Sequence, residues 1–365
     1  MARTSRVTLA TVARRAGVSV STASKVLNSR PGASPDTRSR VRVAMRDLGY
    51  YPSTSRSDEP GAQVSRISVV LTELDDAMYT PSMVQGLLET AADQGVQTIV
   101  RLLEPLEDAT TAQLNAWARS LLGGGSQGAV FVACDLMNQA QLEACERVGL
   151  PIVAVDCHTM MDAGVTAITS NNFAGGHSLA RHLLDLGHRR IGLVTGLQTS
   201  ATARERSSGF LTGIAQAGIR QPAELLFEGD FVAEAGAAAA RQFLSLTDPP
   251  TAIAASCDSC AMGVIDSARA RGLDLPGDLS ITGFDNTKVA IWSSPKLTTV
   301  NQPLKGIAEL AVTTVLAMIH GKSPISHHIQ LGTELVVRDS TAPPRVSSAF
   351  PCDTSQGPHG RLTGG

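Results

Sequence analysis

Apolar residues spaced three or four apart predict two short helices near the N-terminus. The inner face of the first helix holds Leu9, Val12, Ala13 and Ala16. Gly17 ends this helix, because glycine readily adopts the positive φ of a helix C-terminus. Ser19 then caps a second helix, which runs to about Asn28. The inner face of the second helix holds Ala23, Val26 and Leu27, and its outer face holds Val20, Ser21, Ser24, Lys25 and Asn28. This pattern predicts a helix-turn-helix whose second helix has a short polar face suited to a major groove.

From residue 66 onward the pattern changes to short apolar runs, rich in β-branched residues, that alternate with helical segments. The apolar runs have the length of strands and occupy residues 66–73, 97–103, 128–135, 151–157, 165–170, 190–196, 251–258 and 279–285. The helical segments occupy residues 81–95, 110–123, 138–148, 172–187, 204–218, 232–246 and 259–272. This alternation predicts parallel sheets with helices on both faces. Because two units of similar size flank about residue 169, we expect a two-lobed α/β core with a cleft between the lobes.

Two polar segments complete the predicted organisation. Residues 53–65 are rich in Ser, Gly and Pro and are expected to form a linker between a small all-α head, 1–52, and the core, 66–343. The last residues, 344–365, have a similar composition and are expected to be a disordered tail. The tail lacks the leucine heptads that would build a coiled-coil tetramer.

The charge is distributed unevenly along the chain. Residues 1–56 contain eleven Lys and Arg but two acidic residues, a net charge of +9, whereas the rest of the chain carries 20 basic and 31 acidic residues. Any three-helix bundle can contain two helices at a glycine turn, and most such pairs bind no DNA. A basic head is, however, the electrostatic signature of phosphate binding, so the charge favours a DNA-binding head.

Other features narrow the class of protein. No apolar run is long enough to cross a membrane and the N-terminus has no apolar signal-peptide region, so a cytoplasmic protein is expected. The six cysteines are scattered and are expected to be free thiols. Cys257 and Cys260 form a CxxC pair, for which metal or redox chemistry is the alternative to two small buried residues. Without GxGxxG after a strand, GxxxxGK[ST] or GxSxG, we expect no enzyme, no cofactor and no metal site.

Two stretches of the head resemble the lac repressor family of bacterial transcriptional regulators. They read VTLATVARRAGVSVSTASKVLN and SPDTRSRVRVAMRDLGYYP. In the second stretch, Ser34 caps a third helix, Pro35 occupies its first position and Gly49 ends it.

The resemblance implies which residues of the head contact DNA. The base-reading residues would be Val20, Ser21 and Lys25. Val20 offers only an apolar contact, for example to a thymine methyl, whereas Lys25 can reach O6 and N7 of guanine. The family more often has Arg at the position of Lys25, so the planar guanidinium is absent here. The residues that would contact phosphates are Thr8, Ser19, Thr22, Asn28, Ser34 and Thr37. Helix capping alone is the alternative role for this second group.

Four stretches of the core resemble the periplasmic-binding-protein-like core of the same family. They read GHRRIGLVTG, ARERSSGFLTGIAQAG, DLSITGFDN and SPKLTTVNQP. Together with the head, the similarity runs from about residue 6 to about residue 343. It implies that the chain crosses between the lobes near residues 169, 300 and 326. The predicted lobe 1 then contains about 66–168 and 301–325, and the predicted lobe 2 contains about 169–298 and 328–340.

Polar residues at the carboxyl ends of the predicted strands form the candidate effector site, because ligands of open parallel sheets bind there. Asp156, Asp258 and Asp285 each end a strand. Arg206 lies early in the helix after 190–196, and Phe231 begins another helix. The alternative roles are structural: an aspartate at a strand end is often a helix cap, and such an arginine often bridges two lobes.

The family resemblance gives several of these positions a role. It assigns Arg206 and Asp285 to hydrogen bonds with the effector and Phe231 to stacking, it matches Asp156 to an acid after the fourth strand, and it adds two residues of a lobe-1 loop, Tyr79 and Ser82. An aromatic face packs on the ring C–H groups of a sugar, while Arg and Asp pair with its hydroxyls. The expected effector is therefore a sugar.

The chain departs from the family pattern in the core and in the linker. Cys257 stands where the family usually has Asn, and Asn171 where it often has Asp, so the effector of a relative cannot be transferred. In the linker, Glu59 occupies the position of the leucine that wedges into the DNA minor groove, and Pro60 and Gly61 follow it. Since a carboxylate cannot insert between stacked bases and Pro-Gly breaks a helix, we expect the linker to stay non-helical.

These features together predict an effector-responsive, sequence-specific DNA-binding transcriptional regulator that represses genes of sugar uptake or catabolism. The expected partners are palindromic double-stranded operator DNA, a small-molecule effector and a second copy of the chain in a homodimer, with no membrane. The alternative is a cytoplasmic sugar-binding protein without a DNA role, which the core alone would allow.

Overall fold

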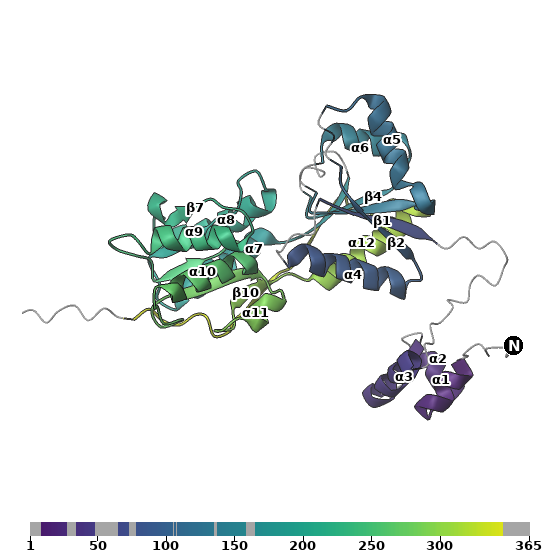
Figure 1. The fold of residues 1–365 in the computed structure, drawn as a ribbon, viewed down its shortest axis with the longest axis horizontal. Coiled ribbons are helices and arrows are strands. Elements are labelled where there is room, and N and C mark those ends of the chain that lie inside the picture. The colour runs from purple at the N-terminus through teal and green to yellow at the C-terminus, as the bar shows by residue number, and fades with distance from the viewer. Residues whose placement is uncertain are drawn as a thin grey trace, which may run out of the picture. The chain divides into compact units, whose positions relative to one another are not determined.

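The computed structural model describes residues 9–27, 34–47, 65–72, 78–104, 106, 108–134, 137–157 and 165–345 (Figure 1). The chain separates into two compact units, Met1–Val64 and Ser65–Gly365. The predicted linker, apart from Ser65, and the predicted tail beyond Arg345 lie outside the described residues.

The first unit is a small all-α head. Its helices are α1 (Leu9–Ala16), α2 (Val20–Leu27) and α3 (Pro35–Asp47). Their buried side chains form one core, made of Val12, Ala13, Ala16, Ala23, Val26, Val41 and Ala44. Between α1 and α2, Gly17 has a φ of +66°, which glycine adopts without strain. The Val18 N–H donates to the Ala13 carbonyl at 3.0 Å, and the Val18 side chain packs on the core. The predicted helix-turn-helix is confirmed.

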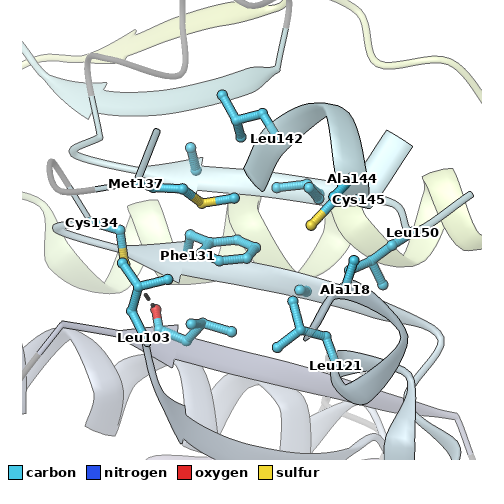
Figure 2. Close-up of a cluster of buried hydrophobic side chains, with 14 of the residues drawn as sticks. Leu103, Ala118, Leu121, Phe131, Cys134, Met137, Leu142, Ala144, Cys145 and Leu150 are labelled. Carbon is cyan, nitrogen blue, oxygen red and sulfur yellow. Dashed lines mark hydrogen bonds between the residues drawn. The ribbon is translucent and has the colours of Figure 1, made fainter. Parts of the chain in front are cut away.

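The second unit begins with lobe 1, a parallel sheet in the strand order β11-β5-β4-β3-β1-β2. Its strands are β1 (Arg66–Leu71), β2 (Gln97–Leu102), β3 (Gly128–Val132), β4 (Ile152–Val155), β5 (Thr166–Ser170) and β11 (His328–Leu331). Two helices, α4 (Tyr79–Asp93) and α12 (Leu304–Ile319), cover one face of the sheet (Figure 1). On the other face, α5 (Thr111–Leu121) and α6 (Gln139–Arg147) pack around the fully buried Phe131 (Figure 2). The 3-10 turn η1 (Gly123–Gly125) leads into β3.

Lobe 2 is a second six-stranded sheet, in the order β12-β10-β9-β8-β6-β7, in which only the edge strand β12 runs antiparallel. Its strands are β6 (Ile191–Val194), β7 (Leu226–Phe227), β8 (Ala252–Ala254), β9 (Ser280–Asp285), β10 (Thr298–Asn301) and β12 (Glu334–Val336). Its helices are α7 (Asn172–Asp185), α8 (Ala201–Gln216), α9 (Ala233–Phe243), α10 (Asp258–Ala270) and the short α11 (Lys288–Trp292), with a 3-10 turn, η3 (Ala223–Leu225), before β7. Helices α7 and α8 cover one face of this sheet, and α9 and α10 cover the other. The predicted fold class, a helical head with a two-lobed α/β core of parallel sheets, is confirmed.

The chain passes between the two sheets three times. It leaves β5 for α7 at Asn171 and leaves β10 for α12 after residue 301, close to the expected crossings at 169 and 300. The third crossing, expected near 326, lies between β11 and β12. This crossing lies later in the sequence than expected because β11 belongs to lobe 1, where it pairs with β5 in a register that places His328 opposite Ala167.

The described residues extend into the predicted tail, which begins at residue 344. Arg345 is fixed to lobe 2 by ion pairs to Asp274, at 2.7 Å, and to Asp278. Among the described residues, no helix is both long and apolar enough to span a membrane.

Candidate functional site

The exposed face of α2 presents the three residues that the sequence predicts to read bases. Ser21 and Lys25 are exposed, and half of the Val20 surface is accessible to solvent (50 %). The opposite face of the helix is buried through Ala23 and Val26. An apolar side chain and a cation therefore stand on the outside of the second helix of a helix-turn-helix, the side that enters a major groove.

Four of the predicted phosphate contacts form side-chain caps on the helices of the head. Ser19 Oγ accepts the Thr22 backbone N–H at 3.1 Å and lies 2.9 Å from the Thr22 hydroxyl. Ser34 Oγ accepts the Thr37 N–H at 3.2 Å and donates to the Thr37 hydroxyl at 2.9 Å. Capping is therefore present, and phosphate contact stays a prediction because both roles suit a helix N-terminus. The remaining two, Thr8 and Asn28, lie outside the described residues.

In lobe 2, Arg206 is the centre of a buried polar cluster. It projects from α8, and its Nη2 forms an ion pair with Asp285 Oδ1 at 3.1 Å. Its Nε donates to Asn172 Oδ1 at 2.9 Å, and its Nη1 donates to the Ser256 carbonyl at 2.8 Å. The guanidinium also lies 3.9 Å from the ring centroid of Phe284, so it is held on both its polar edge and its flat face.

Close packing of α7 against α8 fixes the position of this arginine. A Cβ at Gly176 would lie 2.1 Å from the carbonyl oxygen of Arg206, and a Cβ at Gly209 would lie 2.0 Å from that of Phe173. Only glycine allows backbones to approach this closely. As a result, Asn172 at the start of α7 and Arg206 on α8 come within hydrogen-bonding distance.

The predicted aromatic partner lies beside the arginine. The ring centroid of Phe231 is 5.5 Å from the Arg206 guanidinium carbon, and the residue is partly exposed. The structure therefore brings Arg206, Asp285 and Phe231 together, as the sequence predicted.

Lobe 1 contributes Tyr79 and Asp156. The Tyr79 hydroxyl donates to Asp156 Oδ2, while Asp156 Oδ1 has no hydrogen-bond partner although the residue is buried. Ser82 is not part of this contact, because its hydroxyl donates to the Met78 carbonyl at 2.6 Å, inside its own helix turn.

Asp156 of lobe 1 lies near enough to charged side chains of lobe 2 for them to affect its pKa. Burial raises this pKa to about 7, whereas the Arg206 cation opposes the rise and the nearby Asp285 and Glu205 carboxylates add to it. The Ser170 backbone N–H also lowers it. We call the group formed by Tyr79, Asp156, Arg206, Phe231 and Asp285, together with two further polar residues described below, the inter-lobe site.

Left-handed backbone marks the same strand ends. Asp156 has a φ of +51° after β4, and Asp285 and Asn286 have φ values of +108° and +56° at the end of β9. Non-glycine residues adopt these conformations at a cost, and such residues cluster at functional sites, although Asp and Asn adopt them more readily than other residues.

Asp258 lies nearby but is fully occupied by the protein. Its Oδ1 accepts the Thr299 hydroxyl at 2.5 Å, and its Oδ2 accepts the backbone N–H and the hydroxyl of Thr287 at 2.7 and 3.0 Å. Burial raises its pKa to about 7, and the neighbouring Asp285 adds to the rise. With 1 % of its surface exposed, Asp258 braces the end of β9 and offers no free oxygen to a ligand.

Two further polar residues complete the inter-lobe site. Gln302, at the crossing after β10, donates its Nε2 to Asp285 at 2.6 Å and leaves its Oε1 without a partner. Glu205, next to Arg206 in the sequence, is half-buried and leaves its Oε2 without a partner. Sequence patterns pointed to site residues at the ends of predicted strands and missed both of these. Gln302 follows β10, a strand that was not predicted, and Glu205 lies on helix α8.

The CxxC pair has a structural position. Cys257 is the N-cap of α10, its Sγ accepts the Cys260 N–H at 3.3 Å, and its thiol donates to the Phe231 carbonyl at 3.2 Å. Both cysteines are buried, and burial raises the pKa of the Cys260 thiol to about 11. Within the described residues there is no group of three His, Cys, Asp or Glu that could hold a metal ion.

Comparison with known proteins identifies the family to which the chain is similar. The sequence model of bacterial regulatory proteins of the lacI family matches residues 8–53, and that of the periplasmic binding protein-like domain matches residues 180–341. A protein of Serratia proteamaculans described as HTH-type transcriptional repressor PurR is 31 % identical over 336 residues, which cover 92 % of this chain and 97 % of the relative. A protein of Klebsiella pneumoniae with the same description is 30 % identical over 336 residues, which again cover 92 % of this chain and 97 % of the relative.

Solved structures of similar architecture include two regulators with bound ligands. A complex of the transcriptional regulator CelR with cellobiose has a TM-score of 0.67 at 25 % identity and covers 92 % of this chain and 100 % of its own. The lac repressor dimer bound to operator and the anti-inducer ONPF has a TM-score of 0.65 at 27 % identity. The match covers 93 % of this chain and 100 % of the lac repressor chain. The chain therefore belongs to the lacI family of bacterial regulatory proteins and is a DNA-binding transcriptional regulator.

Proposed function

We propose that this regulator represses transcription by binding a palindromic operator as a homodimer, and that a small-molecule effector at the inter-lobe site controls this binding. The observation that carries the proposal is the buried cluster of Arg206, Asp285 and Phe231 in lobe 2, with Asp156 of lobe 1 near enough to interact electrostatically with both charged groups. An effector that bridges these residues holds the lobes in one arrangement, and it can shift a two-state equilibrium by its differential affinity for the two states.

The head supplies the DNA-binding half of the proposal. One short recognition helix reads few base pairs, so two heads related by twofold symmetry are needed for a specific site, and their target is an inverted repeat. Val20, Ser21 and Lys25 stand exposed on the recognition helix and are proposed to read bases. The head caps Ser19, Thr22, Ser34 and Thr37 are proposed to hold phosphates, together with Thr8 and Asn28.

Exposed apolar side chains on the core support the homodimer. Val100 and Leu102, on the edge strand β2, are 45 % and 63 % exposed. In lobe 2, Ile291 and Trp292 on α11 are 51 % and 72 % exposed. Exposed apolar side chains on an edge strand favour pairing with another chain, and tryptophan is enriched at the centre of protein interfaces. We therefore propose that two copies associate through their α/β cores.

A sugar is the proposed effector. Phe231 can pack against ring C–H groups, while the unpartnered oxygens of Asp156 and Glu205 can accept hydroxyl donors. The similar CelR structure contains cellobiose, which agrees with this class.

The proposal is tested by selecting an operator from random DNA with the full chain and then measuring binding with added sugars and nucleosides. We expect an inverted repeat whose affinity changes when one of the sugars is present. Selection of a sequence without twofold symmetry would contradict the dimeric mode. A selected operator whose binding no compound changes would contradict control by an effector.

A further inference from the structure

The inter-lobe site contains more hydrogen-bond acceptors than donors. Three buried or half-buried oxygens have no partner: Asp156 Oδ1, Glu205 Oε2 and Gln302 Oε1. Asp156 and Gln302 are 5 % and 3 % exposed, so bulk water does not compensate for the missing bonds. Buried acceptors without partners are costly, and a ligand that brings N–H or O–H donors to them removes this cost.

The guanidinium of Arg206 is already committed to protein partners. Each nitrogen of Arg206 donates to a protein oxygen, and its charge is matched by the Asp285 carboxylate at 3.1 Å. Arg204, on the same helix, is exposed and donates to the carbonyls of Gln198 and Thr199.

From this balance we infer that the effector binds without a negative charge, as a hydroxyl-rich neutral compound whose O–H groups donate to Asp156, Glu205 and Gln302, and that its phosphate esters are rejected. The inference rests on the proposed effector function of the inter-lobe site and specifies its ligand. A phosphate there would meet the carboxylates of Asp156, Glu205 and Asp285, whereas the Arg206 cation is already paired with Asp285. The other basic side chains that act on Glu205, Arg204 and His328, are exposed. Like charges placed together in a desolvated site are strongly unfavourable.

The test compares neutral compounds with their own phosphate esters. Thermal shift and calorimetric titration of the full chain would be run at about pH 8, above the pKa of about 7 of Asp156, so that this carboxyl is mostly ionised. They would use glucose with glucose 6-phosphate, ribose with ribose 5-phosphate, and adenosine with adenosine 5′-monophosphate, extended to neutral disaccharides and their esters. For each neutral compound that binds, we expect its ester to bind about a hundredfold or more weakly. An ester that binds within tenfold of its parent, or esters that bind where the parents do not, would overturn the inference.

Failure of the wider proposal has a different signature. If no neutral compound and no ester binds while the chain still binds its operator, the effector-responsive function itself is contradicted, and the inference with it. A compound that binds and changes operator affinity supports the function whatever its charge.

Isosteric variants test whether the carboxylates cause the discrimination. Asp156→Asn and Glu205→Gln each replace a carboxyl group by a neutral amide and keep the shape of the side chain. Each is expected to weaken the neutral compound about tenfold or more, because a charged acceptor is lost, and to narrow the ratio between parent and ester. The matched control is Asp266→Asn, an exposed acid on α10, which should change neither affinity. A loss of affinity in Asp156→Asn and Glu205→Gln with an unchanged parent-to-ester ratio would show that the carboxylates act only structurally and would overturn the inference.

Discussion

Removal of the Arg206 side chain should destabilise lobe 2 as well as abolish the effector response. Arg206 is 8 % exposed, and Arg206→Ala would leave the buried Asp285 carboxylate without its cation and Asn172 Oδ1 without its donor. Breaking a buried ion pair by deleting one partner typically costs about 3–5 kcal/mol. Because Arg206 lowers the pKa of both Asp156 and Asp285, its loss raises both values further, so the loss of stability should be larger at pH 8 than at pH 6.

Urea unfolding monitored by tryptophan fluorescence measures this loss directly. The chain has two tryptophans, Trp117 in lobe 1 and Trp292 in lobe 2, so a Trp117→Phe background reports on lobe 2 alone. The matched control is Arg204→Ala, an exposed arginine on the same helix, which should cost about 0.5 kcal/mol or less.

The result that would refute this reasoning is a loss of about 1 kcal/mol or less for Arg206→Ala, equal to that of the control. A double-variant cycle with Asp285→Asn adds a second check. If the two side chains stabilise each other, the double variant should lose less than the sum of the two single variants. Strict additivity would show that the 3.1 Å contact contributes nothing to stability.

Three further predictions concern the head, the interface and the pH dependence. Lys25→Ala should cost about 1–3 kcal/mol of operator binding and relax preference at one base pair per half-site; an equal loss on operator and random DNA in salt-matched titrations would contradict a base-reading role. Trp292→Ser should shift the core toward monomer in sedimentation at micromolar concentration, and an unchanged dimer would remove α11 from the interface. For Asp156, the folded-state pKa of about 7 exceeds the ordinary value of 3.8, so the folded chain holds a proton that the unfolded chain has released. Stability should therefore fall as the pH rises from about 4 to about 7, and Asp156→Asn should flatten this part of the plot of melting temperature against pH. If the variant shows the same fall as the wild type, ionisation of Asp156 is not its cause.

The parts of the fold that the sequence predicts best are the strands buried on both faces. β3 and β4 are continuous apolar runs, and each is wholly buried in the structure. The strands that were not predicted are short, polar or at an edge. β10 consists of Thr298, Thr299, Val300 and Asn301, and the alternating exposure of β11 reflects its position at the edge of the lobe-1 sheet.

The missed strands explain what the sequence could not show about the site. Strand ends and family resemblance pointed to Asp156, Arg206 and Asp285, which the structure brings together. The saturation of Asp258 could not be foreseen, since one of its donors, Thr299, lies on β10. The role of Gln302 was hidden for the same reason, because its position depends on where the chain crosses between the lobes.

The central claim is that an effector bound at the inter-lobe site controls operator binding by the head. Fluorescence anisotropy of a labelled selected operator, titrated with the full chain with and without a neutral compound that binds the core, tests it most directly. The account predicts that the compound changes operator affinity of the wild-type chain by about fivefold or more, that Asp156→Asn loses this response, and that Asp266→Asn keeps it. An Asp156→Asn variant that responds as fully as the wild type, or a wild-type affinity that the bound compound leaves unchanged, would contradict it.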